Sequence, residues 1–334
     1  MEHFDLTRAQ DVASAIAAAS AGAAQDAPVR FLAGGTTLVD LMKLNVERPA
    51  RVIDINRLPL DQVESLPGGG VRIGALVRNA DLAHHPLIAS AYPVLSQALL
   101  SGASAQLRNM ATTGGNLLQR TRCVYFRDIT SSCNKRTPGS GCAALGGMNR
   151  NLAILGTSSH CIATNPSDMN VALTALDATI HIMGEHGQRS VAIDDFFLLP
   201  GDTPQRETVL DPGELITHVT LPPPWPDSRS LYLKLRDRAS YEFALASAAV
   251  VVRQAAGRIV AVRVALGGVG TKPWRARAAE AALQSHAPDA ERLRAASEAA
   301  LAGAQPQSEN GFKIELARRC LAHALTQATT GAAA

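Results

Sequence analysis

Four of the five cysteines in this 334-residue chain stand close together in the sequence, and thiols readily hold metals. They are Cys123, Cys133, Cys142 and Cys161, with the spacing C-x9-C-x8-C-x18-C, while Cys320 stands alone. Four thiolates can close a metal site. An odd number of cysteines with four clustered is weak evidence for a disulfide framework. The pattern therefore predicts a metal site in this segment.

The spacing alone does not identify the metal. It contains no C-x2-C pair, so it departs both from zinc fingers and ribbons and from ferredoxins. The surroundings favour iron and sulfide, because basic side chains stabilise the net negative charge of a cluster with four thiolates. Between residues 120 and 150 a single acid, Asp128, stands among Arg120, Arg122, Arg127, Lys135, Arg136 and Arg150. A zinc site, unligated buried thiols and a basic anion-binding loop stay open as alternatives.

Two glycine-rich loops indicate where an anion could bind. Residues 34–37 (GGTT) lie between an expected strand and an expected helix, where glycine allows close approach and a helix N-terminus offers free N–H groups. Residues 112–116 (TTGGN) repeat the same chemistry. Either loop alone could be a plain connector, and neither matches the Rossmann or P-loop pattern. Together they favour a site for the phosphates of a dinucleotide.

Asp168 follows a turn-forming Asn-Pro-Ser sequence and could accept hydrogen bonds from ribose hydroxyls. It could equally be a first-turn acid that the helix dipole favours.

The elements expected around these residues alternate between strands and helices. Helices are expected at 7–20, 38–45, 80–106, 168–178 and from 274 to 329, and strands at 28–33, 51–56, 71–77, 178–184, 231–236, 243–254 and 258–268. Four prolines between residues 222 and 226 make a helix or central strand implausible there and predict a domain boundary. The strands followed by helices beyond it are typical of an α+β module.

The composition excludes several classes of protein. Apolar residues make up 46% and charged residues 18%, which is ordinary for a globular protein. A formal charge of +3 is too small to indicate nucleic acid or an anionic membrane as partner. No apolar run approaches the ~20 residues that a membrane-spanning helix needs. We also expect no signal peptide, because the first residues lack a basic region followed by an apolar one.

Five motifs together resemble the FAD-binding middle subunit of the molybdenum hydroxylases, the xanthine dehydrogenase family. They are FLAGGTTLVDLMK, RNMATTGGNLL, ATNPSDMNVAL, DPGELITHVTLP and KLRDRASYEFALAS, and the likeness runs from about residue 4 to 328. The cysteine insert resembles a smaller branch, the FAD- and iron–sulfur-binding subunits of bacterial periplasmic aldehyde oxidoreductases. The resemblance implies an α+β chain with a two-part FAD-binding domain at 1–223, a 4Fe–4S insert at about 119–162, and a C-terminal α+β domain at 229–330.

The resemblance also implies roles for individual residues. The loop around the FAD pyrophosphate would comprise Arg30, Phe31, Leu32, Ala33, Gly34, Gly35, Thr36, Thr37 and Leu38. The second phosphate loop would comprise Thr112, Gly115 and Asn116. Asp168 would meet ribose or ribityl hydroxyls, and Lys234 would lie near the flavin. The ligands of one 4Fe–4S cluster would be Cys123, Cys133, Cys142 and Cys161.

The implied function is electron transfer within a heterotrimer. A large molybdenum-cofactor subunit would oxidise an aldehyde, a small 2Fe–2S subunit would pass the electrons on, and FAD would deliver them to oxygen or another acceptor. We hypothesise that the ring of Tyr241 covers the flavin face where a nicotinamide would stack; it could instead pack at a hairpin end. The 4Fe–4S cluster could relay electrons or hold its loop in place. The resemblance favours export to the periplasm with a signal-bearing partner, and a cytoplasmic location is the alternative.

Three other functions remain to be tested. The flavin subunit of a 4-hydroxybenzoyl-CoA reductase-like complex also carries a 4Fe–4S insert, with a different cysteine spacing. A zinc-stapled adaptor would bind nucleic acid, which the weak charge and scarce aromatics disfavour. A free-standing flavin oxidase would have no use for the cysteine insert.

Overall fold

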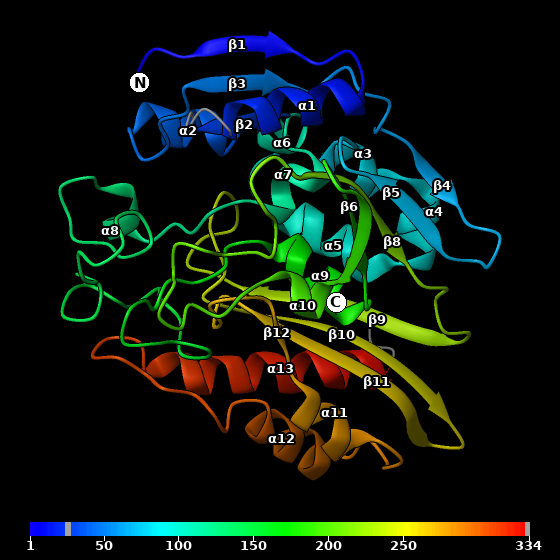
Figure 1. Cartoon of the computed structure of the whole chain (residues 1–334). Helices are drawn as coiled ribbons and strands as arrows, with labels where there is room; N and C mark the ends of the chain where they lie inside the picture. The colour runs from blue at the N-terminus through cyan, green and yellow to red at the C-terminus, as the bar shows by residue number, and fades with distance from the viewer. Residues whose placement is uncertain (24–27, 331–334) are drawn as a thin grey trace.

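The computed structural model describes residues 1–23 and 28–330, and its strands form three sheets. The N-terminal sheet lies at one end of the molecule, the second sheet lies in the middle, and the third lies at the other end with the C-terminal helices (Figure 1).

The first sheet is parallel, with the strand order β1-β3-β2. Its elements are β1 (Asp5–Arg8), α1 (Val12–Ala23), β2 (Val29–Leu32), α2 (Leu38–Lys43) and β3 (Arg51–Asp54). The expectation of a helix from residue 7 was wrong at its start, because residues 5–8 pair with β3 instead. The helix begins only after Asp11, whose carboxylate accepts a hydrogen bond from the Ser14 N–H at 2.7 Å.

The second sheet is antiparallel, with the order β4-β5-β8-β6-β7. Its strands are β4 (Val63–Ser65), β5 (Val71–Gly74), β6 (Thr179–Gly184), β7 (Gly187–Ala192) and β8 (Leu215–Leu221). The helices around it are α3 (Asn79–His84), α4 (Pro86–Ala91), α5 (Pro93–Ser101), α6 (Ala105–Arg108), α7 (Thr113–Leu117), α9 (Asp168–Ala175) and α10 (Ile193–Phe196). β8 pairs with β5 across a long stretch of sequence, and the buried residues of this sheet and its helices share one large core.

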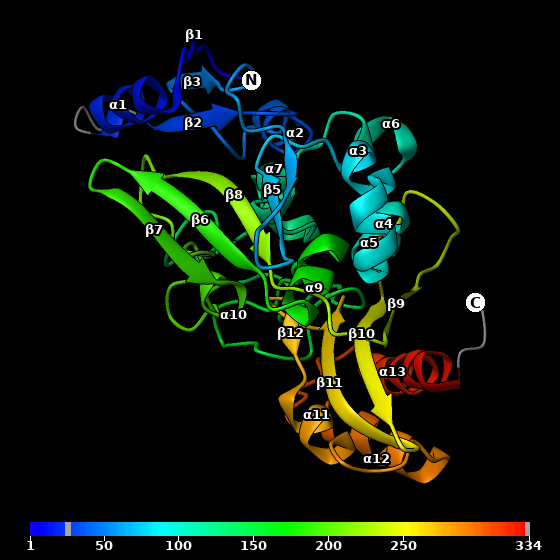
Figure 2. The same cartoon turned by 90° about the vertical axis from the view of Figure 1, so that its right-hand side faces the viewer.

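The third sheet is antiparallel, with the order β12-β11-β10-β9. Its elements are β9 (Ser228–Leu235), β10 (Ala246–Ala255), β11 (Arg258–Gly267), β12 (Trp274–Arg275), α11 (Arg277–Leu283), α12 (Ala290–Ala299) and α13 (Phe312–Thr330). The helices cover one face of the sheet (Figure 2). Alternate residues of β10 point to opposite faces. Val250 therefore packs among the C-terminal helices, while Ala249 and Val251 join the central core.

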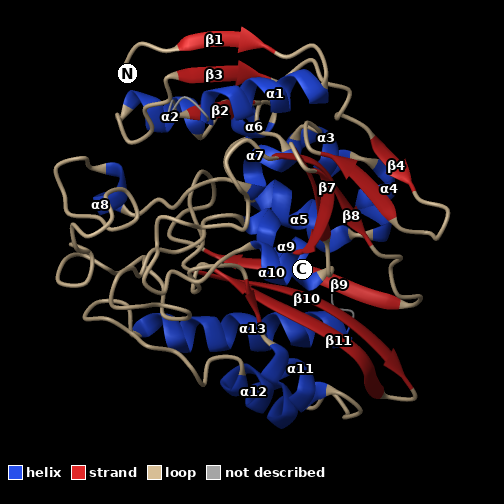
Figure 3. Ribbon diagram, viewed as in Figure 1, coloured by secondary structure: helices blue, strands red, loops and turns tan. Residues whose placement is uncertain are grey.

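The cysteine segment has little regular structure. Between α7 and α9 the chain runs mostly as loops around α8 (Val124–Arg127), as Figure 3 shows. A small cluster of buried side chains, including Phe126, Leu152 and Ile162, lies beside the cysteines. This segment therefore depends on side-chain contacts more than the rest of the chain does.

Candidate functional site

The first glycine-rich loop, residues 34–37, lies where β2 ends and α2 begins. A Cβ atom on Gly34 would lie 1.9 Å from the carbonyl oxygen of Met110, so only glycine permits this contact. Gly35 has a φ of +75°, a left-handed conformation that favours glycine. The loop is thereby held directly against the chain that leads into the second loop.

The second loop is fixed at the end of β5. The hydroxyl of Thr112 caps α7 by accepting a hydrogen bond from the Gly115 N–H at 3.2 Å. The N–H of Thr113 donates to the carbonyl of Val77 at 2.9 Å, and both threonines are 1% exposed. The N–H of Gly114 likewise donates to the carbonyl of Ala75 at 2.8 Å, so the N–H groups of the first turn of α7 are occupied and hold this loop against the end of β5.

Two cavities meet at these loops. The first, of about 760 Å³, is bounded by β2, the first loop, the cysteine segment and residues 197–214. The second, of about 500 Å³, is bounded by α2, α9 and residues 238–243. The residues that line both cavities are Thr36, Thr37, Gly115, Gln119 and Pro166. This arrangement suits an elongated ligand with a ring system at each end and an anionic middle.

Most of the residues predicted to bind FAD lie at these cavities. The first cavity is lined by Arg30, Phe31, Ala33, Gly34, Gly35, Thr36, Thr37, Leu38, Thr112 and Gly115. The second is lined by Asn116, Asp168 and Tyr241, together with Thr36, Thr37 and Gly115. Leu32 and Lys234 line neither, so their contact with the cofactor stays a prediction.

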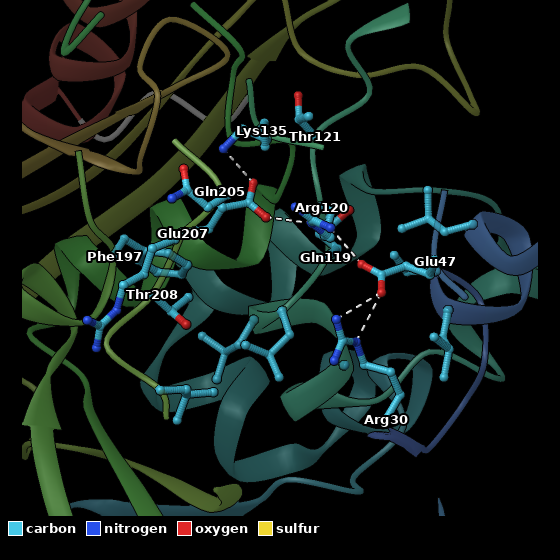
Figure 4. Close-up of a pocket in the computed structure, with 18 of the residues that line it drawn as sticks. Arg30, Glu47, Gln119, Arg120, Thr121, Lys135, Phe197, Gln205, Glu207 and Thr208 are labelled. Carbon is cyan, nitrogen blue, oxygen red and sulfur yellow. Dashed lines mark hydrogen bonds and ion pairs between the residues drawn. The ribbon is translucent and has the colours of Figure 1, made fainter. Parts of the chain in front are cut away.

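A row of alternating charges follows the wall of the first cavity (Figure 4). Glu47 pairs with Arg30 at 3.0 Å and with Arg120 at 2.6 Å. Glu207 pairs with Arg120 at 2.6 Å and with Lys135 at 2.8 Å. Burial alone would raise the pKa of Glu207, but Arg120 and Lys135 hold that pKa below its ordinary value. The row therefore joins β2, beside the first glycine loop, to the cysteine segment.

Asp168, in the second cavity, is held by two buried partners. Its carboxylate accepts a hydrogen bond from the Tyr232 hydroxyl at 2.5 Å and an ion-paired bond from Lys234 Nζ at 2.7 Å. Lys234 also donates to the carbonyl of Ser101 at 3.1 Å and is 2% exposed, so it lies behind Asp168. Burial raises the pKa of Tyr232 well above its ordinary value, which keeps its hydroxyl a donor. These contacts orient the carboxylate that lines the cavity.

Tyr241 stands at the rim of the second cavity. It is 60% exposed, and its φ of +55° is unusual for a tyrosine. Its N–H donates to the carbonyl of Ala103 at 3.3 Å, and its own carbonyl accepts from Arg238 at 2.6 Å. These two bonds hold the backbone of Tyr241 in this left-handed conformation.

The four clustered cysteines line one small cavity of their own. Cys133 and Cys142 face each other in a short antiparallel bridge, and Cys123 directly precedes α8. All are free thiols, buried except for the partly exposed Cys142. Burial raises the pKa of Cys123 to about 11 and also raises that of Cys161. Thiols that stay protonated until a cation arrives would release protons on metal binding.

Hydrogen bonds within the segment hold the loops around this cavity. The N–H of Cys133 donates to the Ser140 hydroxyl at 3.1 Å. Arg136 donates to the carbonyl oxygens of Tyr125 and Phe126 at 2.7 and 2.8 Å. The prediction that the basic residues surround a cluster needs refinement, because this arginine is occupied by backbone carbonyls.

Other basic residues of the segment pair with distant acids. Arg122 and Arg127 both bind Asp40, at 3.0 and 2.8 Å, and Arg150 binds Asp237 at 2.8 Å. The carboxylates that the sequence analysis missed are Asp40, Glu47, Glu207 and Asp237. Each is an isolated acid far from the cysteines in sequence, so no local pattern indicated its role.

Comparison with known families agrees with this geometry. Residues 2–224 match the model of the FAD-binding domain in molybdopterin dehydrogenase. The chain belongs to this family. Residues 231–328 match the C-terminal domain of the CO dehydrogenase flavoprotein. The predicted fold, a two-domain FAD-binding α+β chain, is confirmed.

Individual relatives show how close the family relationship is. The chain is 53% identical to "Aldehyde oxidoreductase FAD-binding subunit PaoB" of Escherichia coli K12, over 93% of this chain and 95% of that protein. It is 31% identical to the glyceraldehyde dehydrogenase medium chain of Sulfolobus acidocaldarius, over 75% and 72% of the two chains. A solved structure of carbon monoxide dehydrogenase from Hydrogenophaga pseudoflava superposes with a TM-score of 0.77, at 27% identity over 99% of both chains.

Proposed function

We propose that this chain is the electron-transfer flavoprotein subunit of a molybdenum-dependent aldehyde oxidoreductase. The observation that carries the proposal is the 53% identity to an aldehyde oxidoreductase FAD-binding subunit over 93% of the chain. The proposed partners are a large molybdenum-cofactor subunit, which oxidises the aldehyde, and a small 2Fe–2S subunit, which delivers the electrons. When bound, FAD supplies the step from single electrons to electron pairs. This chain contributes the binding and positioning of its cofactors.

The two joined cavities support a specific placement of FAD. The pyrophosphate would lie beside residues 34–37 and 112–116, where the cavities meet. The flavin would occupy the second cavity, where Asp168 can accept bonds from ribityl or ribose hydroxyls, and the adenosine would occupy the first. In this proposal residues 1–223 form the FAD-binding domain and residues 229–330 form the C-terminal domain.

The four cysteines are the proposed ligands of a 4Fe–4S cluster. One zinc ion would draw four sulfurs to about 2.3 Å from a single centre. Within the described residues no group of three or more His, Cys, Asp or Glu is arranged around one ion. The four free thiols nevertheless share one cavity, and a cluster binds each thiolate through a separate iron atom. The four thiols in one cavity are the observation that supports the cluster, and metal analysis of the purified chain distinguishes it from zinc, which four thiolates can also hold.

The cluster could relay electrons or hold the segment in place. A cluster that joins four distant positions reduces the entropy cost of ordering the loops. Substituting Cys133 by serine separates the two roles. If the partner subunits reduce FAD at an unchanged rate in this variant, the relay role is wrong.

Tyr241 supports oxygen or a protein as the electron acceptor. Its ring stands at the rim of the cavity assigned to the flavin, where a nicotinamide would need to stack. The intact complex should therefore form little NADH with an aldehyde as donor. Appreciable NADH formation would remove this part of the proposal.

The proposed location is the periplasm, reached together with a partner that carries an export signal. No helix within residues 1–23 and 28–330 is long and apolar enough to cross a membrane. Fractionation of cells with and without the signal of the partner tests this proposal. Retention of the chain in the cytoplasm in both cases would contradict it.

Reduction of the flavin by an aldehyde through the partners tests the function itself. In the anaerobic assembled complex, an aldehyde should bleach the flavin absorbance, whereas the isolated chain with the same aldehyde should show no change. Turnover of a small molecule by the isolated chain would favour a free-standing oxidase and contradict the subunit proposal.

A further inference from the structure

The cysteine segment forms part of the wall of the first cavity. Lys135, Cys161 and Ala163 line both that cavity and the small cavity of the cysteines. Arg120 and Thr121 from the start of the segment also line the first cavity. The two proposed cofactor sites therefore share a wall.

Glu207 joins the segment to the rest of this wall. Its carboxylate pairs with Arg120 at 2.6 Å and with Lys135 at 2.8 Å. In the sequence, Arg120 stands before Cys123 and Lys135 stands after it. Its backbone carbonyl accepts from the Leu198 N–H at 3.0 Å, and Lys135 donates in addition to the carbonyl of Pro204 at 2.9 Å. The end of the segment is attached to the same residues elsewhere, because the Ser158 hydroxyl donates to the Gly201 carbonyl at 2.9 Å and His160 lies 3.4 Å from the Asp202 carboxylate.

We propose that Glu207 is a positioning residue through which metal loading of the four cysteines strengthens FAD binding. This inference rests on the proposed function, since it assumes both cofactors. Residues 119–162 contain one four-residue helix and are held mainly by side-chain bonds, so a bound cluster would add to their order. Once the segment is ordered, Lys135 holds Glu207 and Glu207 holds Arg120 in the cavity wall. FAD then binds to a wall that is already ordered, so less conformational entropy is lost when it binds.

The charges of the row are consistent with a favourable coupling. A cluster with four thiolates and the FAD pyrophosphate are both negative and would repel each other. Arg30, Arg120 and Lys135 lie with Glu47 and Glu207 along the shared wall, so the row carries three positive and two negative charges. Arg30 is the cation at the end of the row beside the first glycine loop, and Lys135 is the cation at the end beside the cysteines. Each cation therefore lies toward one of the two anions, which offsets their repulsion.

The test compares FAD affinity with and without the cluster in the full-length chain. We expect the cluster-loaded chain to bind FAD about tenfold more tightly than the same chain stripped of iron by a chelator, within the usual range of coupling. Glu207→Gln keeps the size of the side chain but loses its charge, and should reduce this ratio below about twofold. Lys135→Gln is the second variant if Glu207→Gln does not fold.

Glu280→Gln is the matched control. Glu280 is also a partly buried carboxylate with two partners, Arg275 and the Val264 N–H, but it lies in the C-terminal part of the chain. This variant should lose stability and keep the tenfold ratio. Equal FAD affinity of the loaded and the stripped wild-type chain would overturn the coupling but not the proposed cluster. A full tenfold ratio in Glu207→Gln would overturn the role of Glu207 in the coupling. A chain that never holds iron would overturn the proposed cluster as well, and iron analysis distinguishes the two failures.

Discussion

The backbone around the two glycine loops belongs to regular elements, whereas the backbone around the four cysteines belongs to loops. The first glycine loop follows β2 and the second begins α7. Fully buried threonines fix the second loop on the central sheet. The cysteine segment has one short helix and is held by side-chain bonds such as those of Arg136 and Glu207. The first site is formed by the fold itself, whereas in our proposal the second needs the cluster to be complete. Variants in each region should therefore fail in different ways.

The largest effect should follow from Cys133→Ser. Removing one of four thiolates should lower the iron content from about four per chain to near zero, because the other three cannot hold the cluster stably. Residues 119–162 should then become more sensitive to a protease. Metal analysis and limited proteolysis measure both effects.

Cys320→Ala is the control for that variant. Cys320 is 1% exposed among the C-terminal helices, remote from the other cysteines, so this variant should keep all its iron. Full iron content in Cys133→Ser would show that this thiol is not a ligand.

Gly34→Ala should damage the other region. The new methyl group would meet the Met110 carbonyl at 1.9 Å and push the two glycine loops apart. Overpacking of this kind costs about 1–3 kcal/mol, so FAD affinity should fall about 10- to 100-fold while the iron stays bound. FAD titration monitored by fluorescence measures the loss.

Gly68→Ala controls for the loss of glycine as such. A Cβ at Gly68 meets nothing within 4 Å, so FAD affinity should not change. An unchanged affinity in Gly34→Ala would contradict the close contact between the loops.

Lys313→Met tests the attachment of the cysteine segment to the C-terminal sheet. Lys313 is fully buried, and its Nζ donates to the carbonyls of Leu152 at 3.0 Å and Gly268 at 2.5 Å. Leaving these acceptors unsatisfied should cost about 2–4 kcal/mol in the free energy of unfolding, measured with urea. Lys43→Met, at an exposed position, should stay within about 0.5 kcal/mol of the wild type.

The same lysine gives a pH dependence. Burial, with a smaller effect of Arg150, lowers the pKa of Lys313 from 10.5 to about 7. Between these values the unfolded chain binds a proton that the folded chain does not, so stability from this group rises with pH across that window. The difference between wild type and Lys313→Met should therefore widen from pH 7 to pH 10.5. Parallel profiles would contradict the lowered pKa.

Tyr232→Phe should give the smallest effect. It removes the hydroxyl that donates to Asp168 and should weaken FAD binding about fivefold, since one hydrogen bond is worth about 1 kcal/mol. Tyr92→Phe removes another buried hydroxyl, bonded to the Pro222 carbonyl at 2.8 Å, and should leave FAD affinity unchanged. Equal affinities in the two variants would show that Tyr232 does not position Asp168.

Local chemistry in the sequence indicated the two glycine loops as a possible phosphate site and the four cysteines as a possible metal site. Asp168 was singled out by the family resemblance, since its residue type alone also fits a first-turn acid. The structure brings the loops to one junction and the cysteines to one cavity.

Features that depend on distant segments could not be predicted. Strand β8 was missed, since it pairs with β5, which lies far away in sequence. Strand β7 was missed although it forms a tight hairpin with β6, because its largely exposed residues show no apolar run. The helical region expected over 80–106 is divided into four helices, because Pro86 and Pro93 each start a new helix and Gly102 ends the third, before Ser104 caps the fourth. Glu47 and Glu207 were missed because their function depends on arginines brought near only by folding.

The most direct test of the account is the cofactor content of the chain purified without oxygen. We expect one FAD, about four iron and about four sulfide per chain, with flavin absorption bands and a broad shoulder near about 400 nm. Zinc without flavin would contradict the account. The glycine loops would then be plain connectors, and the cysteine segment would belong to a zinc-stapled adaptor.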